Sequence, residues 1–399
     1  MRPMRILFVV GGASQTVGGH VISSITLANY TYQRNYDVGL LLSPLKSHLP
    51  ELDRCRFPIY YKDCLPFKGA ILNRPWDILE VVRKYRYQII VAMDWYAAMY
   101  AGLASVCGKI PVIQVIAGGK GPPSSPLNLP GIVVFSEELM QSVPEKYQIP
   151  GENFILSRGR VDFEAFRSSS NHHTTEENLG FHQGSPRILS ISRLTMEKAP
   201  AISALFKQIE EYAKHKPIQC IVIGEGIARS MLEAEADKIM EATDHRAEIR
   251  FLGGFRVNQN HLRQADLVVG QGRTVIEAIA SSVPAAVAGK DGYFGLVTPE
   301  SLPELAVSNL TGRNLQPFSS LLEDIENLPK YKQSEQLIVY NLAFQMYDAN
   351  LGAEALEKAI DCLLRFYQDK KMSRLKLAKI WLEGWYRGLS SFFQIRIKS

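Results

Sequence analysis

One glycine-rich turn in this chain combines residue types that can hold a phosphate group and a sugar. The run ADLVVG (residues 265–270) predicts a buried strand, and TVIEAIAS (residues 274–281) predicts a helix. Gly270 and Gly272 lie in the turn between them, where the missing side chains leave backbone N–H groups open. A helix N-terminus attracts anions, and Glu277, about one turn into the helix, can accept hydrogen bonds from vicinal hydroxyls such as those of a ribose. An ordinary strand-turn-helix with a surface glutamate fits the same spacing.

Short apolar runs alternate with helical patterns in the first half of the chain, in the order expected of a parallel sheet with helices on both faces. The strand candidates are residues 6–10, 38–42, 88–93, 111–116 and 132–136. Helical patterns cover residues 20–36 and 78–87.

A polar segment, residues 157–187, contains few periodic apolar residues and is typical of a linker. The alternation then restarts, with strand candidates at residues 187–192, 220–226, 248–254, 266–270 and 284–289. We therefore expect an α/β chain with two Rossmann-like domains facing each other across a cleft, since ligands bind at the carboxyl ends of parallel strands. The expected division is residues 1–170 for the first domain, 185–335 for the second, 336–370 for C-terminal helices, and 371–399 for a basic amphipathic tail.

The glycine-rich turn resembles the donor-binding motif of the retaining glycosyltransferases of family four, whose fold is GT-B. That motif runs Glu, Gly, any residue, Gly, then four residues and a second Glu followed by Ala. Gly270, Gly272, Glu277 and Ala278 fall in register with it. The resemblance covers about Arg5 to Tyr367, and its pieces occur in the family's order.

The resemblance implies that residues 1–170 form the acceptor domain, that residues 185–335 form the nucleotide-sugar-binding domain, and that the helices of residues 336–370 cross back to the first domain. It also implies roles for residues of both domains. Arg193 and Lys198 would hold the donor diphosphate and Glu277 the ribose, which makes these three the candidate catalytic residues. Fixed cations suit that role because a diphosphate leaving group gains negative charge as the glycosidic bond breaks. The residues implied to bind the donor are Gly18, Gly19, Gly253, Gly254, Phe255, Gly270, Gly272, Arg273, Thr274 and Glu277.

The chain departs from the family's pattern at two positions. Val269 replaces the first Glu of the donor motif, and Ala117 replaces a histidine that often contacts the transferred sugar. Residues on loops expected to face the cleft could supply acceptor or sugar contacts instead, namely His20, Lys120, Asp291 and Tyr293. His20 could also simply cap the helix that follows it.

Composition limits the class of protein. A chain of 399 residues is long enough for two domains, and its 46% hydrophobic and 21% charged residues are typical of a soluble globular protein. The five cysteines are scattered and form no CxxC pair, which favours a reduced, cytosolic setting. The cleft segments contain no Asp-x-Asp motif, so we expect no metal and no other cofactor. No apolar run approaches the roughly 18 residues that cross a bilayer.

The net charge of +5 is concentrated at one end. Eight lysines and arginines against one glutamate give residues 370–399 a charge of +7, which leaves −2 for residues 1–369 and argues against a nucleic-acid partner. Apolar residues of this tail recur at helical spacing: Leu377, Trp381, Trp385, Leu389 and Phe392. This combination is typical of a helix lying on an anionic membrane surface, although a final helix packed on the protein would show the same stripe.

These patterns together predict a retaining, hexosyltransferase-like glycosyltransferase. It would move a sugar from a nucleotide diphosphate sugar to a saccharide or lipid-linked acceptor in cell-surface glycan synthesis. We expect it in the cytoplasm, and peripheral on the inner membrane face if the tail binds lipid. Val269 and Ala117 also leave open a non-catalytic GT-B partner of an active enzyme, and a UDP-sugar epimerase is a further alternative.

Overall fold

The computed structural model describes residues 3–11, 18–43, 49–62, 74–117, 126–167 and 178–384. Two compact units divide the chain. The first combines Met1–Arg160 with Ala349–Ser399, and the second is Val161–Asp348. The boundary thus falls before the expected position near residue 170, and the segment 336–370 is shared between the two units.

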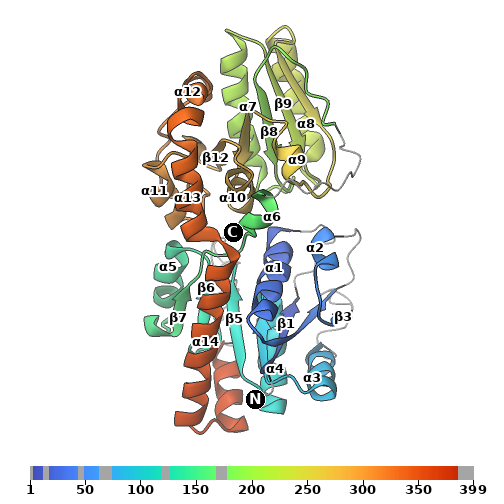
Figure 1. The fold of residues 1–399 in the computed structure, drawn as a ribbon, viewed down its shortest axis with the longest axis vertical. Helices are drawn as coiled ribbons and strands as arrows, with labels where there is room; N and C mark the ends of the chain where they lie inside the picture. The colour runs from blue at the N-terminus through green and yellow to red at the C-terminus, as the bar shows by residue number, and fades with distance from the viewer. Residues whose placement is uncertain are drawn as a thin grey trace, which may run out of the picture. The chain divides into compact units, whose positions relative to one another are not determined.

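The first unit contains a seven-stranded sheet in the order β3-β2-β1-β4-β5-β6-β7, and its neighbouring strands pair in parallel (Figure 1). The strands are β1 (Arg5–Val10), β2 (Asp37–Leu42), β3 (Ile59–Tyr61), β4 (Ile89–Ala92), β5 (Val112–Ile116), β6 (Ile132–Val134) and β7 (Phe154–Leu156). The helices are α1 (Gly19–Gln33), α2 (Pro50–Asp53), α3 (Arg74–Tyr85), α4 (Trp95–Gly108), α5 (Glu137–Tyr147), the 3-10 helix η1 (Gly151–Asn153) and α14 (Ala349–Asp369). All five predicted strands are confirmed, and β3 and β7 were not predicted.

Helix α14 belongs to the first unit although it follows the second in sequence. It packs against α1 and against β5, β6 and β7 (Figure 1). Glycines allow this close approach, because a Cβ atom on Gly352 would lie 2.1 Å from the carbonyl oxygen of Gly159. A Cβ atom on Gly131 would likewise lie 2.7 Å from the carbonyl oxygen of Ala359.

The second unit contains a six-stranded sheet in the order β10-β9-β8-β11-β12-β13, parallel except for the β12–β13 pair. The strands are β8 (Arg187–Ile191), β9 (Ile218–Ile223), β10 (Ala247–Phe251), β11 (Leu267–Gly270), β12 (Ala285–Gly289) and β13 (Gly292–Leu296). The helices are α6 (Phe163–Arg167), α7 (Ala199–Ala213), α8 (Arg229–Ala242), α9 (Gln259–Leu262), α10 (Arg273–Ala280), α11 (Ser301–Val307), α12 (Leu321–Ser334) and α13 (Gln336–Tyr347). From β8 the chain adds β9 and β10 on one side of the sheet, and then crosses to β11 on the other side of β8. The direction in which strands are added therefore reverses between β8 and β11.

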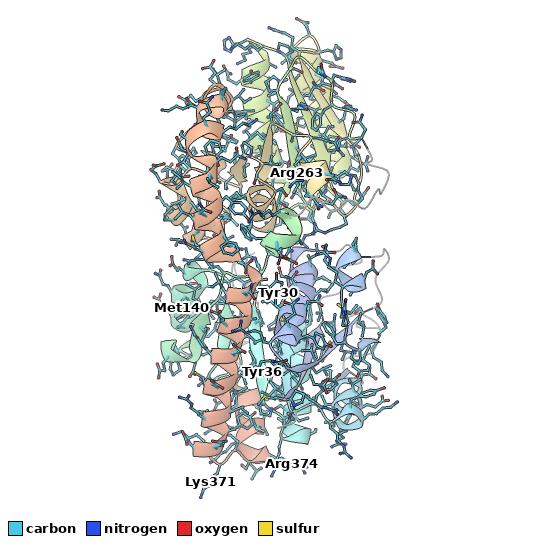
Figure 2. All side chains as sticks on the ribbon, in the orientation of Figure 1. Tyr30, Tyr36, Met140, Arg263, Lys371 and Arg374 are labelled. Atoms are coloured by element: carbon cyan, nitrogen blue, oxygen red, sulfur yellow. The ribbon has the colours of Figure 1, made fainter. Side chains whose placement is uncertain are left out.

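Part of the predicted linker is structured. Val161 and Phe163 are fully buried in the core of the second unit, and α6 packs against α10. Arg263, labelled in Figure 2, donates a hydrogen bond of 3.2 Å to the carbonyl oxygen of Phe166. The linker prediction was therefore wrong for these residues, because a few large apolar side chains suffice to anchor a short helix.

The C-terminal tail forms a helix over residues 374–384. Leu377 is buried, and the indole Nε1 of Trp381 donates a hydrogen bond of 3.2 Å to the carbonyl oxygen of Met99 on α4. These two members of the predicted membrane-facing stripe thus pack on the protein, while its other members lie outside the described residues. None of the helices in the described residues has the length and apolar character needed to cross a membrane.

Candidate donor site at the carboxyl edge of the second sheet

Five parallel strands of the second unit end at the same edge of the sheet. Arg193 follows β8, the segment 253–255 follows β10, and Gly272 follows β11. Thr274 joins the two central loops, because its Oγ1 donates a hydrogen bond of 3.2 Å to the carbonyl oxygen of Ile191 at the end of β8. These loops therefore meet where the strand order reverses, the usual place for a ligand in such sheets.

The turn after β11 brings the start of α10 close to the sheet. A Cβ atom on Gly270 would lie 2.8 Å from Cγ2 of Thr274, and Gly272 has a φ of +54°, which favours glycine. Gly272 is the N-cap residue, and the amide of Ile276 donates to its carbonyl oxygen at 3.2 Å. The amides of Thr274 and Val275 precede this first intrahelical bond, so they provide the positive end of the helix.

Glu277 is buried and paired with two arginines. Arg256 donates from Nη2 to Oε1 at 2.9 Å and from Nη1 to Oε2 at 3.1 Å. Arg273 adds a hydrogen bond of 2.8 Å from its Nε to Oε1. Burial would raise the pKa of Glu277, but the charges and hydrogen bonds of the two guanidinium groups outweigh it and hold that pKa below its usual range. Glu277 thus fixes two cations at the carboxyl edge, and a ribose hydroxyl that reached it would share or replace one of these bonds.

Lys198 is connected to the same turn. Its Nζ donates a hydrogen bond of 2.7 Å to Oε1 of Gln271, which lies between the two glycines. The Nε2 of Gln271 in turn donates to the carbonyl oxygen of Ala288 in β12 at 2.9 Å. The ammonium group of Lys198 is therefore held at the start of α10.

Several cations gather near Lys198. Burial lowers the pKa of Lys198 most, Glu197 raises it, and the positive charges of Arg193 and Arg313 lower it further. The net effect is a pKa below the usual value for lysine. Such a concentration of positive charge suits a polyanionic ligand.

The loop after β10 needs glycine for its packing. Gly253 has a φ of +80°, and its carbonyl oxygen accepts a hydrogen bond of 2.7 Å from the amide of Gly224 after β9. A Cβ atom on Gly254 would lie 2.6 Å from Cγ of Glu225. Phe255 is partly exposed at the same edge. Backbone conformation and close packing therefore account for the two glycines, and the partly exposed ring of Phe255 could contact a ligand.

Asp291 and Tyr293 occupy different surroundings, although they are two residues apart. Asp291 is exposed in the turn between β12 and β13, at the carboxyl edge, where it pairs with Lys290. Tyr293 is buried, and its hydroxyl donates a hydrogen bond of 2.5 Å to Oδ2 of Asp324. The structure thus differs from the expected sugar contact at Tyr293, because the hairpin turns this side chain into the domain core.

A hollow of about 490 Å³ lies away from these loops. It is lined by residues of β13, α11 and α12, including Leu296, Glu304 and Lys330. Because β13 is antiparallel to β12, Leu296 lies at the opposite edge of the sheet from the glycine-rich turn. The candidate site is therefore defined by the loops at the carboxyl edge of the sheet and not by this hollow.

The first unit holds the remaining candidates. Gly18 is the N-cap residue of α1 and Gly19 its first residue, so His20 is not the capping residue. Lys120 lies outside the described residues. Ala117 is half-buried just after β5, in line with the departure noted in the sequence.

Sequence reasoning did not single out four residues that shape these edges. In the first unit, Oδ2 of Asp94 accepts a hydrogen bond of 2.7 Å from the amide of Gly11, after β1. The other three residues belong to the second unit and are Arg256, Gln271 and Arg313. Arg256 follows Phe255 directly, but nothing in the sequence indicates that its side chain turns toward Glu277. Within the described ranges, the His, Cys, Asp and Glu side chains form no group of three or more that could hold a metal ion.

No family model matches the chain, and no curated protein sequence matches it. Solved structures do. A glycosyltransferase from Rickettsia africae gives a TM-score of 0.67 at 16% identity, over 92% of this chain and 99% of that one. Anabaena HepE, solved with UDP and glucose, gives 0.61 at 16% identity, over 90% and 99%. The chain has the GT-B fold.

A GT-B fold does not by itself define an activity. The N-terminal domain of a trehalose-6-phosphate phosphatase from Candida albicans also resembles this chain, with a TM-score of 0.61 at 12% identity, over 90% of this chain and 97% of that one. Function must therefore be argued from the residues at the carboxyl edge.

Proposed function

We propose that this GT-B protein is a retaining glycosyltransferase that binds a nucleotide diphosphate sugar at the carboxyl edge of its second domain. The hydrogen bond between Lys198 and Gln271 carries this proposal, because it holds an ammonium group beside the start of α10. Helix amides and a fixed cation together suit a diphosphate. Arg193, exposed after β8, adds a second cation at the same edge.

The chemistry follows from these charges. The bond between the anomeric carbon and the diphosphate oxygen breaks, and the diphosphate leaves with an added negative charge. Lys198, Arg193 and the amides of α10 stabilise that charge most in the transition state. The acceptor hydroxyl attacks on the same face, and its proton passes to an oxygen of the leaving phosphate, so that configuration is retained without a protein base. The absence of a carboxylate at Val269 is compatible with this route.

The nucleoside would lie along the loop after β10. Phe255 offers a partly exposed ring for the base, and the Arg256–Glu277 pair offers both donors and acceptors for the ribose. HepE, whose fold is similar, was solved with UDP and glucose, which supports UDP-glucose as the first donor to test. The sugar acceptor is proposed to be a saccharide, free or linked to lipid.

We further propose contact between the tail and an anionic membrane surface. Leu375 and Leu382 lie one heptad apart on the helix over residues 374–384 and are 84% and 57% exposed. Lys371 and Arg374 are exposed at its start (Figure 2). Exposed leucines flanked by cations are typical of a helix that binds the surface of a membrane with anionic lipid headgroups. Sedimentation with phosphatidylglycerol vesicles tests this: the L375Q/L382Q double variant should bind less than wild type, and equal binding would contradict it.

Turnover of nucleotide sugars tests the proposed enzyme. The purified chain is incubated with UDP-, GDP- and ADP-sugars and with saccharide acceptors, and the free nucleotide and the sugar products are measured. We expect nucleotide release coupled to a new glycosidic bond for one donor. K198Q should lower the rate at least about tenfold, whereas K214Q, at an exposed lysine paired with Glu211, should not. Epimerised donor without transfer would instead identify an epimerase, and binding without turnover a non-catalytic partner.

A further inference from the structure

The loop between α11 and α12 borders the candidate donor site. The amide of Gly272 donates a hydrogen bond of 2.9 Å to the carbonyl oxygen of Leu310 in this loop. A Cβ atom on Gly289, at the end of β12, would lie 2.5 Å from the carbonyl oxygen of Thr311. The loop thus lies against the ends of β11 and β12, at the carboxyl edge of the sheet.

The position of Arg313 in this loop is fixed by its neighbours. Gly312 has a φ of +70°, and a Cβ atom there would lie 2.2 Å from the ring of Phe294. The half-buried Arg313 donates from Nη2 to the carbonyl oxygen of Ser308 at 3.4 Å, a long hydrogen bond. Its planar guanidinium carries five N–H donors in a fork that matches phosphate oxygens.

Arg313 also interacts electrostatically with Lys198. The positive charges of Arg193 and Arg313 both lower the pKa of Lys198. Lys198 is itself tied to Gln271, next to the Gly272 amide that bonds the Arg313 loop. Three cations from two loops, Arg193 and Lys198 between β8 and α7 and Arg313 between α11 and α12, thus lie near the same turn, and a bound polyanion would relieve their mutual repulsion.

We propose that Arg313 is a third cation of the anion site formed with Arg193 and Lys198, and that it binds a phosphate group of the donor diphosphate. This inference rests on the proposed function and adds a residue from outside the donor motif. It assigns the α11–α12 loop to ligand binding, a role that no motif in the sequence predicts.

Calorimetric titration of the full chain with pyrophosphate, UMP and UDP tests the assignment. The variants are R313Q, R313K and the control R246Q. Arg246 also donates to backbone carbonyls, at 2.7 Å to Lys214 and 3.2 Å to Thr243, but it directly precedes β10, at the opposite edge of the sheet. The control therefore removes an arginine with similar bonds and leaves the donor loops intact.

We expect R313Q to weaken pyrophosphate and UDP binding about tenfold or more and UMP binding less, so that the ratio of UDP to UMP affinity falls. R313K should recover part of the loss, because it restores the charge, and R246Q should bind as wild type does. The assignment is overturned if R313Q binds pyrophosphate like wild type, or if R313Q weakens UMP and UDP equally, as a disturbed loop would.

The two proposals fail in different ways. Pyrophosphate binding that depends on Arg313, in a chain that turns over no nucleotide sugar, would retain the anion site and refute the glycosyltransferase. Turnover that falls with K198Q but not with R313Q would retain the enzyme and refute the role of Arg313. A wild-type chain that binds neither pyrophosphate nor UDP would refute the anion site.

Discussion

Arg256 holds the carboxylate of Glu277 through two parallel hydrogen bonds of 2.9 and 3.1 Å, joining the loop after β10 to the first turns of α10. Arg273 adds a third bond from the same helix. A carboxylate as buried as Glu277 is tolerated only when paired in this way. The pair therefore couples the shape of the candidate site to the stability of the second domain.

Removal of Arg256 should destabilise the protein strongly. R256A leaves the buried Glu277 with one cation instead of two, and we expect the free energy of unfolding to fall by about 3 kcal/mol. Urea denaturation measures this change. R250A is the matched control, because Arg250 pairs with Glu248 at a more exposed position and should cost less than about 1 kcal/mol. Equal losses in the two variants would contradict a buried, structural pair.

The Glu277 pair should also make stability depend on pH. Since the folded-state pKa of Glu277 lies below its ordinary value near 4.3, its stabilisation is present in full above that value and is lost as pH falls through the folded-state pKa. The difference in unfolding free energy between wild type and E277Q should thus be constant from about pH 7 to 5 and shrink at lower pH. A difference that grows toward low pH would show that the pKa is raised instead.

Tyr293 should contribute to stability and not to donor binding. Y293F removes the hydroxyl that donates to Asp324, whose pKa is raised by burial, and we expect a loss of about 1.5 kcal/mol in unfolding free energy. The affinity for UDP should be unchanged, because the side chain lies in the domain core. A loss of UDP affinity without a loss of stability would restore Tyr293 as a ligand contact.

Trp381 should anchor the tail helix to the first domain. A Cβ atom on Gly102 of α4 would lie 2.7 Å from Cδ1 of Trp381, which shows how closely the two helices approach. We expect W381A to lower the unfolding free energy by about 2 kcal/mol and to speed proteolysis after α14. L382Q changes an exposed position on the same helix and should have an effect within about 0.5 kcal/mol. Identical protease sensitivity in the two variants would argue against the anchor.

The sequence predicted most of the fold because buried parallel strands are continuous apolar runs. Strands such as β1 and β11 were found in this way. The three-residue strands β3 and β7 and the hairpin strand β13 were missed. A short strand shows a pattern only within a longer apolar run, as the three-residue β6 does at residues 132–135, and the glycines of β13 suggest a loop.

The candidate site was predictable only where it lies within one motif. The turn at Gly270 and Gly272 is local in sequence, so its geometry follows from neighbouring residues. The contacts of Glu277 with Arg256 and of Lys198 with Gln271 join residues 21 and 73 positions apart. Such contacts depend on how the loops at one sheet edge pack together, which residue spacing along the chain does not encode.

Nucleotide binding tests the central claim most directly. Calorimetric titration with UDP, GDP and ADP should show that one nucleoside diphosphate binds the wild-type chain, that K198Q weakens this binding about tenfold, and that K214Q leaves it unchanged. This result would place a diphosphate beside Lys198 at the carboxyl edge of the second sheet. Failure of all three nucleotides to bind, or equal affinity in wild type and K198Q, would contradict the donor site.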